Sequence, residues 1–303
     1  MMKFFRRNER RQLFGLISPG ALWILLFFNI PLLIMLFISF VERGRAGGIK
    51  LPPVYTLHNY QLFFNACASD FAGPACDPFL YLGIFWHSVR IGVVVTFWCI
   101  LVGYPLAYFI AKQKPVWRDA LMILVIIPFW TNFLVRTYAL KQVLATDGLL
   151  NTFLANLHLI SKPLDMLFNE FGVVVGLIYG YLPFAILPMY TSIEKFDHSL
   201  MEAASDLGAS PQRAFWRVML PMTLPGVIAA FVLVFVPVVG AFVTPDIMGG
   251  GKVEMIGTLI NRQFGVARNW PFGSAMSLIL MVLVLIGVIA YFRSGSEESR
   301  SAL

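Results

Sequence analysis

Six long apolar runs, separated by polar or glycine-rich segments, dominate the pattern of the chain. Each reaches roughly the 20 residues that an α-helix needs to cross the hydrocarbon core of a bilayer. The runs cover residues 13–40, 84–111, 120–140, 171–193, 225–246 and 272–292. The pattern therefore predicts an all-α integral membrane protein with six transmembrane helices.

Prolines interrupt several of these runs. Pro183 and Pro188 fall in the fourth run, and Pro237 and Gly240 fall in the fifth. Because proline removes a backbone donor and obstructs the preceding turn, we interpret the fourth run as a proline-broken helix. Irregular backbone inside a membrane is tolerated where it lines a cavity, so these breaks favour a solute path.

The segment 199–221, which we call the elbow, is the one stretch between apolar runs that has the pattern of a small folded unit. Ser199 and Glu202 have the spacing of a capping box at the start of a helix. The apolar positions that follow repeat with helical spacing and predict one apolar face: Leu200, Ala203, Ala204 and Leu207. Gly208 comes directly after them, where a C-terminal cap with positive φ favours glycine.

A second short helix is expected in the same elbow. Ser210 and Pro211 are typical of the N-cap and the first position of a helix. We expect this helix to stop at Pro221, so that the elbow consists of two capped helices around a glycine turn.

Composition and charge support a membrane protein. Of the 303 residues, 58% are hydrophobic and only 13% are charged, whereas a soluble globule has about a quarter charged residues. The net charge of +7 does not form one basic patch and gives no indication of nucleic-acid binding. Basic residues are concentrated in the N-terminal segment, the 112–118 turn, the elbow and the tail, so the positive-inside rule predicts that both termini are cytoplasmic. The first apolar run is too long for a signal peptide, and we interpret it as an uncleaved span.

Two arginines fall inside apolar runs and need a separate interpretation. Arg90 and Arg136 lie near the predicted outer ends of the second and third runs. Snorkelling of their side chains to the interface is the interpretation we favour. The alternative for Arg136 is an ion pair with a carboxylate that lines the solute path.

Nothing in the sequence indicates catalysis. The only candidate for a phosphate-binding loop is GGGK at 249–252, where Val253 replaces the Ser or Thr that would bind magnesium. The cysteine and histidine spacings predict no metal site and no cofactor in this chain. Cys67 and Cys76 lie in the predicted outer loop 41–83 and either form a disulfide or remain free thiols. Cys99, inside an apolar run, is interpreted as a packing residue.

The elbow resembles the signature of permease subunits of binding-protein-dependent ABC importers. That signature is E-A-A, three residues, G, nine residues, I, one residue, L-P, and this chain departs from it at Val218. The resemblance implies that the elbow is a coupling helix that docks on a cytoplasmic ATPase. Its coupling residues would be Glu202, Ala203, Ala204, Asp206, Gly208, Leu220 and Pro221.

Further motifs resemble the spermidine/putrescine importer permeases. They are PFWTN (128–132), Arg136 with Tyr138, Leu140-Lys141, TSIEK (191–195), DLGAS (206–210), MGGGK (248–252) and NWPFG (269–273). The resemblance implies a type I ABC importer permease with a transmembrane core at 84–292, preceded by 1–83 and followed by a tail at 293–303. It also implies three kinds of partner besides membrane lipid: a second homologous permease, two ATPase subunits that hold ATP and magnesium, and an extracytoplasmic polyamine-binding protein.

A polyamine path needs carboxylates and aromatic faces, because its solute is a flexible polycation. The candidates for that path are Trp130, Tyr138, Tyr179, Tyr181, Asp246 and Glu254. The alternative for each aromatic residue is packing against lipid. Two other functions stay open: a permease for another solute, such as an opine, an amino-acid derivative, sulfate or iron, or an ion-coupled secondary transporter.

Overall fold

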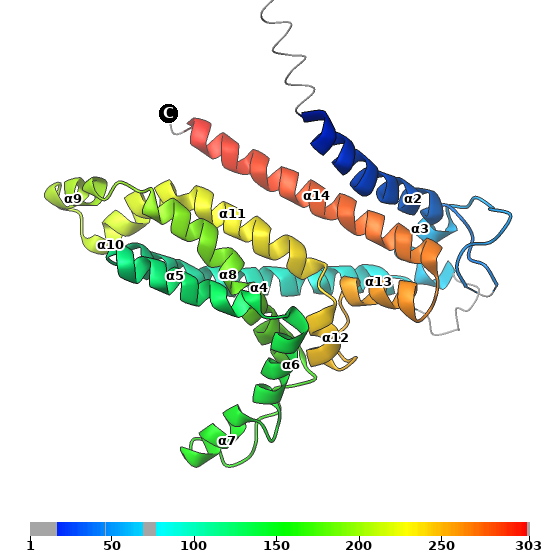
Figure 1. Ribbon diagram of the computed structural model, residues 1–303, viewed down its shortest axis with the longest axis horizontal. Coiled ribbons are helices and arrows are strands. Elements are labelled where there is room, and N and C mark those ends of the chain that lie inside the picture. The colour runs from blue at the N-terminus through cyan, green and yellow to red at the C-terminus, as the bar shows by residue number, and fades with distance from the viewer. Residues whose placement is uncertain (1–16, 46, 69–76, 302–303) are drawn as a thin grey trace, which may run out of the picture. The chain divides into compact units, whose positions relative to one another are not determined.

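The computed structural model describes residues 17–45, 47–68 and 77–301 of the chain, with side chains up to residue 289, and this part is helical (Figure 1). Two isolated bridges, Val41 with Tyr55 and Arg43 with Ile49, are the only β pairing among the described residues. The elements are η1 (Leu25–Asn29), α2 (Ile30–Ser39), α3 (His58–Phe64), η2 (Ala66–Ala68), α4 (Leu80–Ala111), α5 (Pro115–Trp130), α6 (Phe133–Leu144), α7 (Leu149–Asn156), α8 (Glu170–Glu194), α9 (Ser199–Asp206), α10 (Pro211–Ala214), η3 (Phe215–Met219), α11 (Leu220–Val239), α12 (Val243–Gly249), α13 (Ile256–Gly265) and α14 (Trp270–Ser301).

Among the described residues, five helices are individually long and apolar enough to cross a membrane, and one bent pair would make a sixth span. The five are Ile17–Ser39, Leu80–Ala111, Glu170–Glu194, Pro211–Val239 and Trp270–Ile289. The bent pair joins Pro115–Trp130 to Phe133–Asn156 at an angle of 95°. The all-α membrane class is therefore confirmed, with one of its six spans broken.

The chain divides into two compact units. The first contains residues 1–80 and 260–285, and the second contains residues 81–259 and 286–303. The second unit contains the elbow and the predicted solute-path residues. The first contains most of the predicted outer loop.

Close packing of α8 against α11 forms the centre of the second unit. At Gly226 of α11, an added Cβ would lie 2.4 Å from the Cβ of Ser192 and 2.8 Å from the carbonyl oxygen of Pro188. Glycine at this position lets the two backbones approach, as small residues do between membrane helices. Fully buried aliphatic side chains on both helices, such as Ile186 and Val234, complete the contact.

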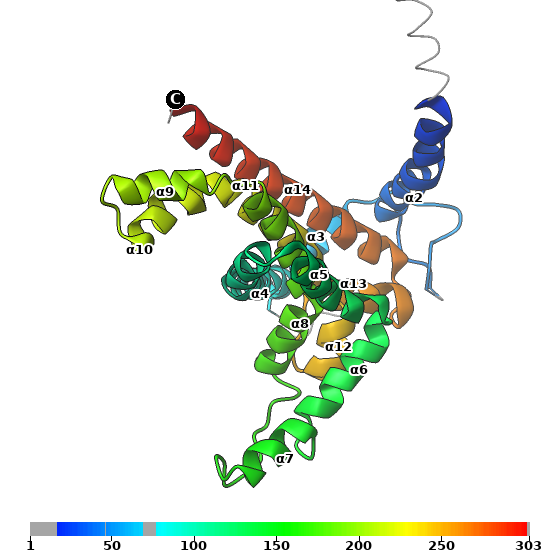
Figure 2. The same cartoon turned by 60° about the vertical axis from the view of Figure 1, so that its left-hand side comes forward.

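The third apolar run is not one straight helix, contrary to the sequence prediction. Helix α5 ends at Trp130, and Asn132 caps α6 by accepting the backbone N–H of Leu134 on its side-chain oxygen at 2.8 Å. The extended backbone of Thr131 and Asn132 turns the chain between the two helices (Figure 2). The run looked continuous because a local cap inside an apolar segment does not change its hydropathy.

The fourth run shows the opposite behaviour. Helix α8 continues through both Pro183 and Pro188, so its interpretation as a proline-broken helix is wrong. Inside a packed membrane protein, neighbouring helices and small adjustments of the backbone satisfy the groups that proline leaves unbonded. The fifth span ends at Val239, earlier than predicted, and Asp246 lies on the separate helix α12.

The outer-loop segment of the first unit is tied together by polar contacts. The side-chain amide of Asn59 donates to the carbonyl oxygens of Ser39 at 2.9 Å and Val41 at 3.0 Å. Cys67 is disulfide-bonded, whereas Cys99 is a buried free thiol. Cys76 lies outside the described residues, so the pairing of Cys67 with Cys76 stays a prediction.

Candidate functional site: the elbow and the cavity above it

Helix α9 of the elbow begins at Ser199, and its cap differs from the predicted one. His198 precedes it in a helical conformation and makes no side-chain capping bond. The side-chain oxygen of Asp197 instead accepts the backbone N–H of Ser199 at 3.0 Å. The capping box of Ser199 and Glu202 is therefore wrong, because a carboxylate two residues earlier is the better acceptor at the positive end of a helix.

The Asp197 cap is sensitive to protonation. Hydrogen bonds from the backbone and then the side chain of Ser199 hold the pKa of the Asp197 carboxyl below its ordinary value. A lowered pKa in the folded state means that the cap stabilises the elbow at neutral pH. That contribution is lost only as the pH falls through the lowered pKa.

The glycine turn is as predicted. Gly208 has φ of +83°, and no atom lies within 4 Å of an added Cβ. The N–H of Gly208 donates to the carbonyl of Ser205 at 2.9 Å, and that of Ala209 donates to the carbonyl of Ala204 at 3.0 Å. These two bonds form a Schellman motif, which satisfies the last carbonyls of the helix only when the residue after its end adopts positive φ.

The second helix of the elbow begins as predicted. Ser210 accepts the N–H of Arg213 on its side-chain oxygen at 3.4 Å, and Pro211 occupies the first turn.

This second helix does not stop at Pro221, however. Residues Pro211–Val239 form one continuous helix that includes the whole fifth span. A π-helical turn precedes the proline, in which the N–H of Leu220 donates to the carbonyl of Phe215, five residues back. The wider turn shifts the hydrogen-bond register ahead of Pro221, which has no N–H of its own, so the helix passes through. The elbow is therefore rigidly continuous with a membrane span (Figure 1).

The apolar face of the elbow is not covered by the described part of the chain. The side chain of Leu207 is 89% exposed, that of Trp216 is 65% exposed and that of Leu200 is 37% exposed. Of the predicted coupling residues, Glu202, Ala203, Asp206, Gly208 and Pro221 are exposed, while Ala204 and Leu220 are half-buried. Exposed apolar side chains grouped on one small unit are typical of an interaction surface.

An ion pair missed by the sequence analysis connects this region to α5. The guanidinium of Arg118, near the start of α5, lies 2.8 Å from a carboxylate oxygen of Glu194, the last residue of α8. The sequence showed Arg118 only as one of several basic residues and Glu194 only as part of TSIEK. Four residues separate Glu194 from the elbow, so α5 is linked to α8 directly beside it.

The structure separates the four aromatic candidates for the solute path. Tyr181 of α8 lines a cavity of about 240 Å³ together with Phe133 of α6 and the turn between α11 and α12. Trp130, Tyr138 and Tyr179 are exposed and are not among the residues that line this cavity. Of the four predicted aromatic residues, Tyr181 alone therefore lines this cavity.

The two predicted carboxylates also differ in their surroundings. Asp246 is exposed in the first turn of α12, and Glu254 is half-buried in the segment before α13. Asp246 is therefore the better hydrated of the two carboxylates. The backbone carbonyl of Glu254 lies 3.1 Å from Nδ1 of His87, which draws this segment against α4.

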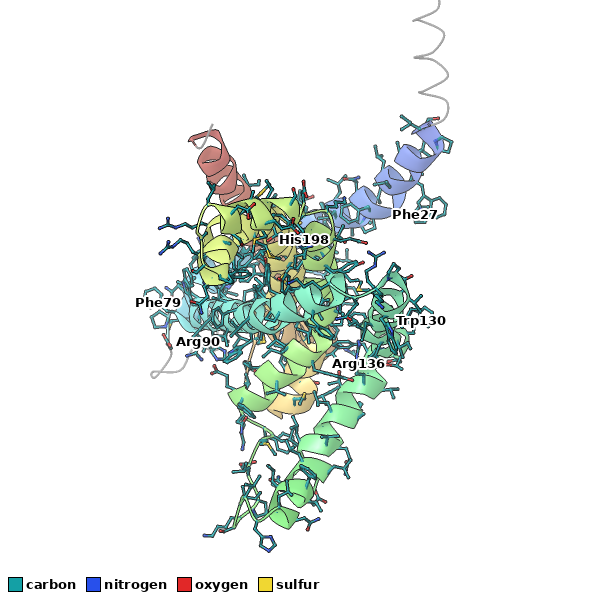
Figure 3. The ribbon with its side chains drawn as sticks, turned by 90° about the vertical axis from the view of Figure 1, so that its left-hand side faces the viewer. Phe27, Phe79, Arg90, Trp130, Arg136 and His198 are labelled. Carbon is teal, nitrogen blue, oxygen red and sulfur yellow. The ribbon has the colours of Figure 1, made fainter. Side chains whose placement is uncertain are left out.

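Arg136 does not snorkel and does not pair with a carboxylate among the described residues. Its side chain is 8% exposed, and its guanidinium donates to the carbonyl of Pro128 at 3.2 Å. The guanidinium carbon also lies 4.6 Å from the ring centre of Phe129 and 5.5 Å from that of Phe133. The buried guanidinium of Arg136 thus contacts residues on both sides of the break between α5 and α6. Figure 3 labels Arg136 and also Trp130, the last residue of α5.

Within the described residues, no group of three or more His, Cys, Asp or Glu side chains could hold a metal ion. The site consists of the exposed apolar side chains of the elbow and the cavity lined by Tyr181 and Phe133. The exposed elbow would serve contact with a partner, and the cavity would serve contact with the solute.

Comparison with known proteins gives a consistent assignment. The family model for the binding-protein-dependent transport system inner membrane component matches residues 103–294. The chain is 41% identical over 278 residues to the spermidine/putrescine transport system permease protein PotB of Haemophilus influenzae, covering 92% of both chains. It is 41% identical over 272 residues to PotB of Escherichia coli K12, covering 90% of this chain and 94% of that one.

A solved structure shares the fold at much lower identity. A bacterial ABC transporter that imports the acidic polysaccharide alginate contains a chain that matches with a TM-score of 0.69 and 15% identity. The match covers 98% of this chain and 99% of that one. At this identity the likeness concerns the fold alone.

Proposed function

This chain belongs to the binding-protein-dependent transport system inner-membrane components, and we propose that it is the permease subunit of an ATP-driven importer of polyamines such as spermidine and putrescine. The observation that carries the proposal is the 41% identity, over 92% of both chains, to a permease named for spermidine and putrescine. ATP hydrolysis belongs to partner subunits, which also hold the magnesium ion. This subunit supplies the membrane passage.

The proposed assembly contains a second, homologous permease, two ATPase subunits and an extracytoplasmic polyamine-binding protein. The elbow faces the cytoplasm, with both chain termini on the same side, and it docks on an ATPase subunit. The exposed side chains of Leu207 and Trp216 support this docking, because an apolar surface of that kind is stabilised when a partner covers it.

The contacts around the elbow suggest how movement reaches the solute path. The second half of the elbow continues into α11 without interruption, and its first half follows α8 closely. The ion pair between Glu194 and Arg118 links α5 to the end of α8 beside the elbow. Helix α5 in turn ends at the break between α5 and α6. In our proposal, a shift of the elbow on the ATPase tilts α11 and α5 together and changes the width of the cavity lined by Phe133 and Tyr181.

The proposed function can be tested with proteoliposomes that contain the complete importer. We expect labelled spermidine to accumulate only when ATP is present on the ATPase side and the binding protein on the other side. Excess putrescine should compete with it, and maltodextrin should not. Accumulation without ATP would indicate an ion-coupled secondary transporter, and ATP-dependent import of another solute only would replace the polyamine assignment.

Replacement of Asp246 by Asn should reduce spermidine import more than putrescine import. The attraction of a carboxylate for an ammonium group 4 Å away is about 1 kcal/mol in water, or about fivefold in affinity. The exposure of Asp246 places it near this aqueous limit. We therefore expect up to about a fivefold rise in the spermidine KM, a smaller rise for putrescine, and loss of both effects at high salt.

The matched control is Asp147→Asn, which removes another exposed carboxylate from the turn between α6 and α7. It should leave both KM values unchanged. Equal effects of the two variants would mean that only the overall charge of this face matters, and an unchanged KM for Asp246→Asn would remove this carboxylate from the solute path.

A further inference from the structure

Two neighbouring residues of α4 hold the backbone of the segment that leads into α13. The hydroxyl oxygen of Ser88, a fully buried residue, accepts the N–H of Ile256 at 2.7 Å and donates to the carbonyl of Ile84 at 2.9 Å. Nδ1 of His87 lies 3.1 Å from the carbonyl oxygen of Glu254. Both contacts hold the short segment 254–256 against α4. This segment connects the glycine-rich turn after α12 to α13.

The second nitrogen of the same imidazole contacts a third element. Nε2 of His87 lies 3.3 Å from a carboxylate oxygen of Glu170, the first residue of α8. Arg90, one turn further along α4, donates to the same carboxylate oxygen at 2.5 Å. That oxygen therefore accepts a hydrogen bond from an arginine, whose guanidinium carries its charge at all physiological pH values.

Each of the two nitrogens of His87 faces one polar atom. One is a backbone carbonyl and the other is a carboxylate, and both can only accept hydrogen bonds. A neutral imidazole carries one N–H and can satisfy one of them, whereas the imidazolium carries two and satisfies both. The contact of α4 with α8 and with segment 254–256 is thus complete only when His87 is doubly protonated.

We propose that His87 is a positioning residue that holds segment 254–256 in the import-competent arrangement when it is protonated. The groups around it come from all three elements: the carboxylate of Glu170 on α8 lies against Nε2, Arg90 on α4 contacts that same carboxylate, and Glu254 presents its backbone carbonyl to Nδ1. Histidine is the side chain whose charge ordinarily changes between about pH 5 and 8. Import should therefore become more efficient as the pH on this face falls within that range. This inference rests on the proposed import function.

The first experiment measures spermidine import by the complete importer in proteoliposomes, with the pH of the binding-protein side varied from 6 to 8 and the lumen buffered. In the wild type we expect the KM to rise about three- to tenfold from pH 6 to pH 8, which corresponds to the loss of one hydrogen bond. Glutamine has one donor nitrogen and does not titrate, so it cannot donate to both acceptors, and His87→Gln should show the high KM at every pH. Solute affinity of the isolated binding protein, measured at each pH, corrects for its own titration.

His158→Asn is the matched control, because His158 is an exposed histidine of the loop after α7 and asparagine tolerates its positive φ of 54°. It should follow the wild-type pH profile. If His87→Gln also keeps the wild-type profile, His87 is not the titrating group and the proposal is overturned.

A second readout does not depend on the solute. Hydrogen exchange of the peptide that contains residues 254–257 should show about three- to tenfold greater protection in the wild type than in His87→Gln at pH 6. At pH 8 the wild type and His87→Gln should exchange alike. The two proteins are always compared with each other at the same pH. Equal protection at pH 6 would overturn the proposal. If the exchange result holds but no polyamine is imported at any pH, the proposed function fails while the role of His87 stands.

Discussion

Gly208→Val should abolish solute-stimulated ATP hydrolysis and reduce import at least tenfold, while the protein still inserts into the membrane. Gly208 has φ of +83°, a conformation that costs about 1–2 kcal/mol for a residue with a side chain and more for a β-branched one. Valine would also break the Schellman bonds that end α9. A helix of 8 residues is marginal without such caps, so we expect the first half of the elbow to unravel. Import and ATPase rates of the reconstituted importer measure the effect.

A matched substitution separates backbone strain from crowding. Gly208→Asn should retain most of the activity, because asparagine tolerates positive φ and no neighbouring atom of the described residues lies within 4 Å of the added Cβ. Loss of activity in both variants would mean that the partner ATPase fills this space in the assembled importer. Normal import by Gly208→Val would remove the geometry of the elbow from the coupling mechanism.

The features that the sequence predicts well are those set by a few adjacent residues. The positive φ of Gly208 and the cap of Ser210 on α10 depend on local backbone chemistry, so their residue types are informative. The cap at Ser199 was assigned to the wrong residue because two acceptors, Ser199 and Asp197, compete within two positions. Sequence spacing alone does not rank them.

Features that depend on distant partners could not be predicted in this way. Hydropathy identified the six apolar runs but did not detect the break at Asn132, because one polar cap changes the average of an apolar run very little. The ion pair of Arg118 with Glu194 joins residues on two different spans. For Arg136, the two interpretations placed the guanidinium at the membrane interface or against a carboxylate. Its actual surroundings are two aromatic rings and a backbone carbonyl.

Arg136→Met should reduce import about tenfold or more and leave ATP hydrolysis poorly stimulated by solute. The carbonyl of Pro128 belongs to the last turn of α5, where the helix leaves carbonyls without partners. Arg136 donates to this carbonyl at 3.2 Å beside the hydroxyl of Thr131, which donates to it at 2.6 Å. The same guanidinium contacts Phe129 on α5 and Phe133 on α6. A hydrogen bond from a charged group contributes about 1.5–3 kcal/mol and a desolvated cation–π contact about 2 kcal/mol. Loss of these contacts would let α5 and α6 move relative to each other at the break, and with them Phe133, which lines the cavity.

Arg136→Lys decides whether shape or charge matters at this position. Lysine keeps the positive charge, but its compact, strongly hydrated ammonium cannot stack on aromatic rings while donating to Pro128 as a planar guanidinium does. We therefore expect Arg136→Lys to be as defective as Arg136→Met. Val135→Met, which enlarges the neighbouring side chain that is 65% exposed, should import normally. Wild-type import by Arg136→Lys would show that a cation alone is sufficient, and the 95° bend would then have to be held by the cap of Asn132 and the packing of Phe129 on Phe184.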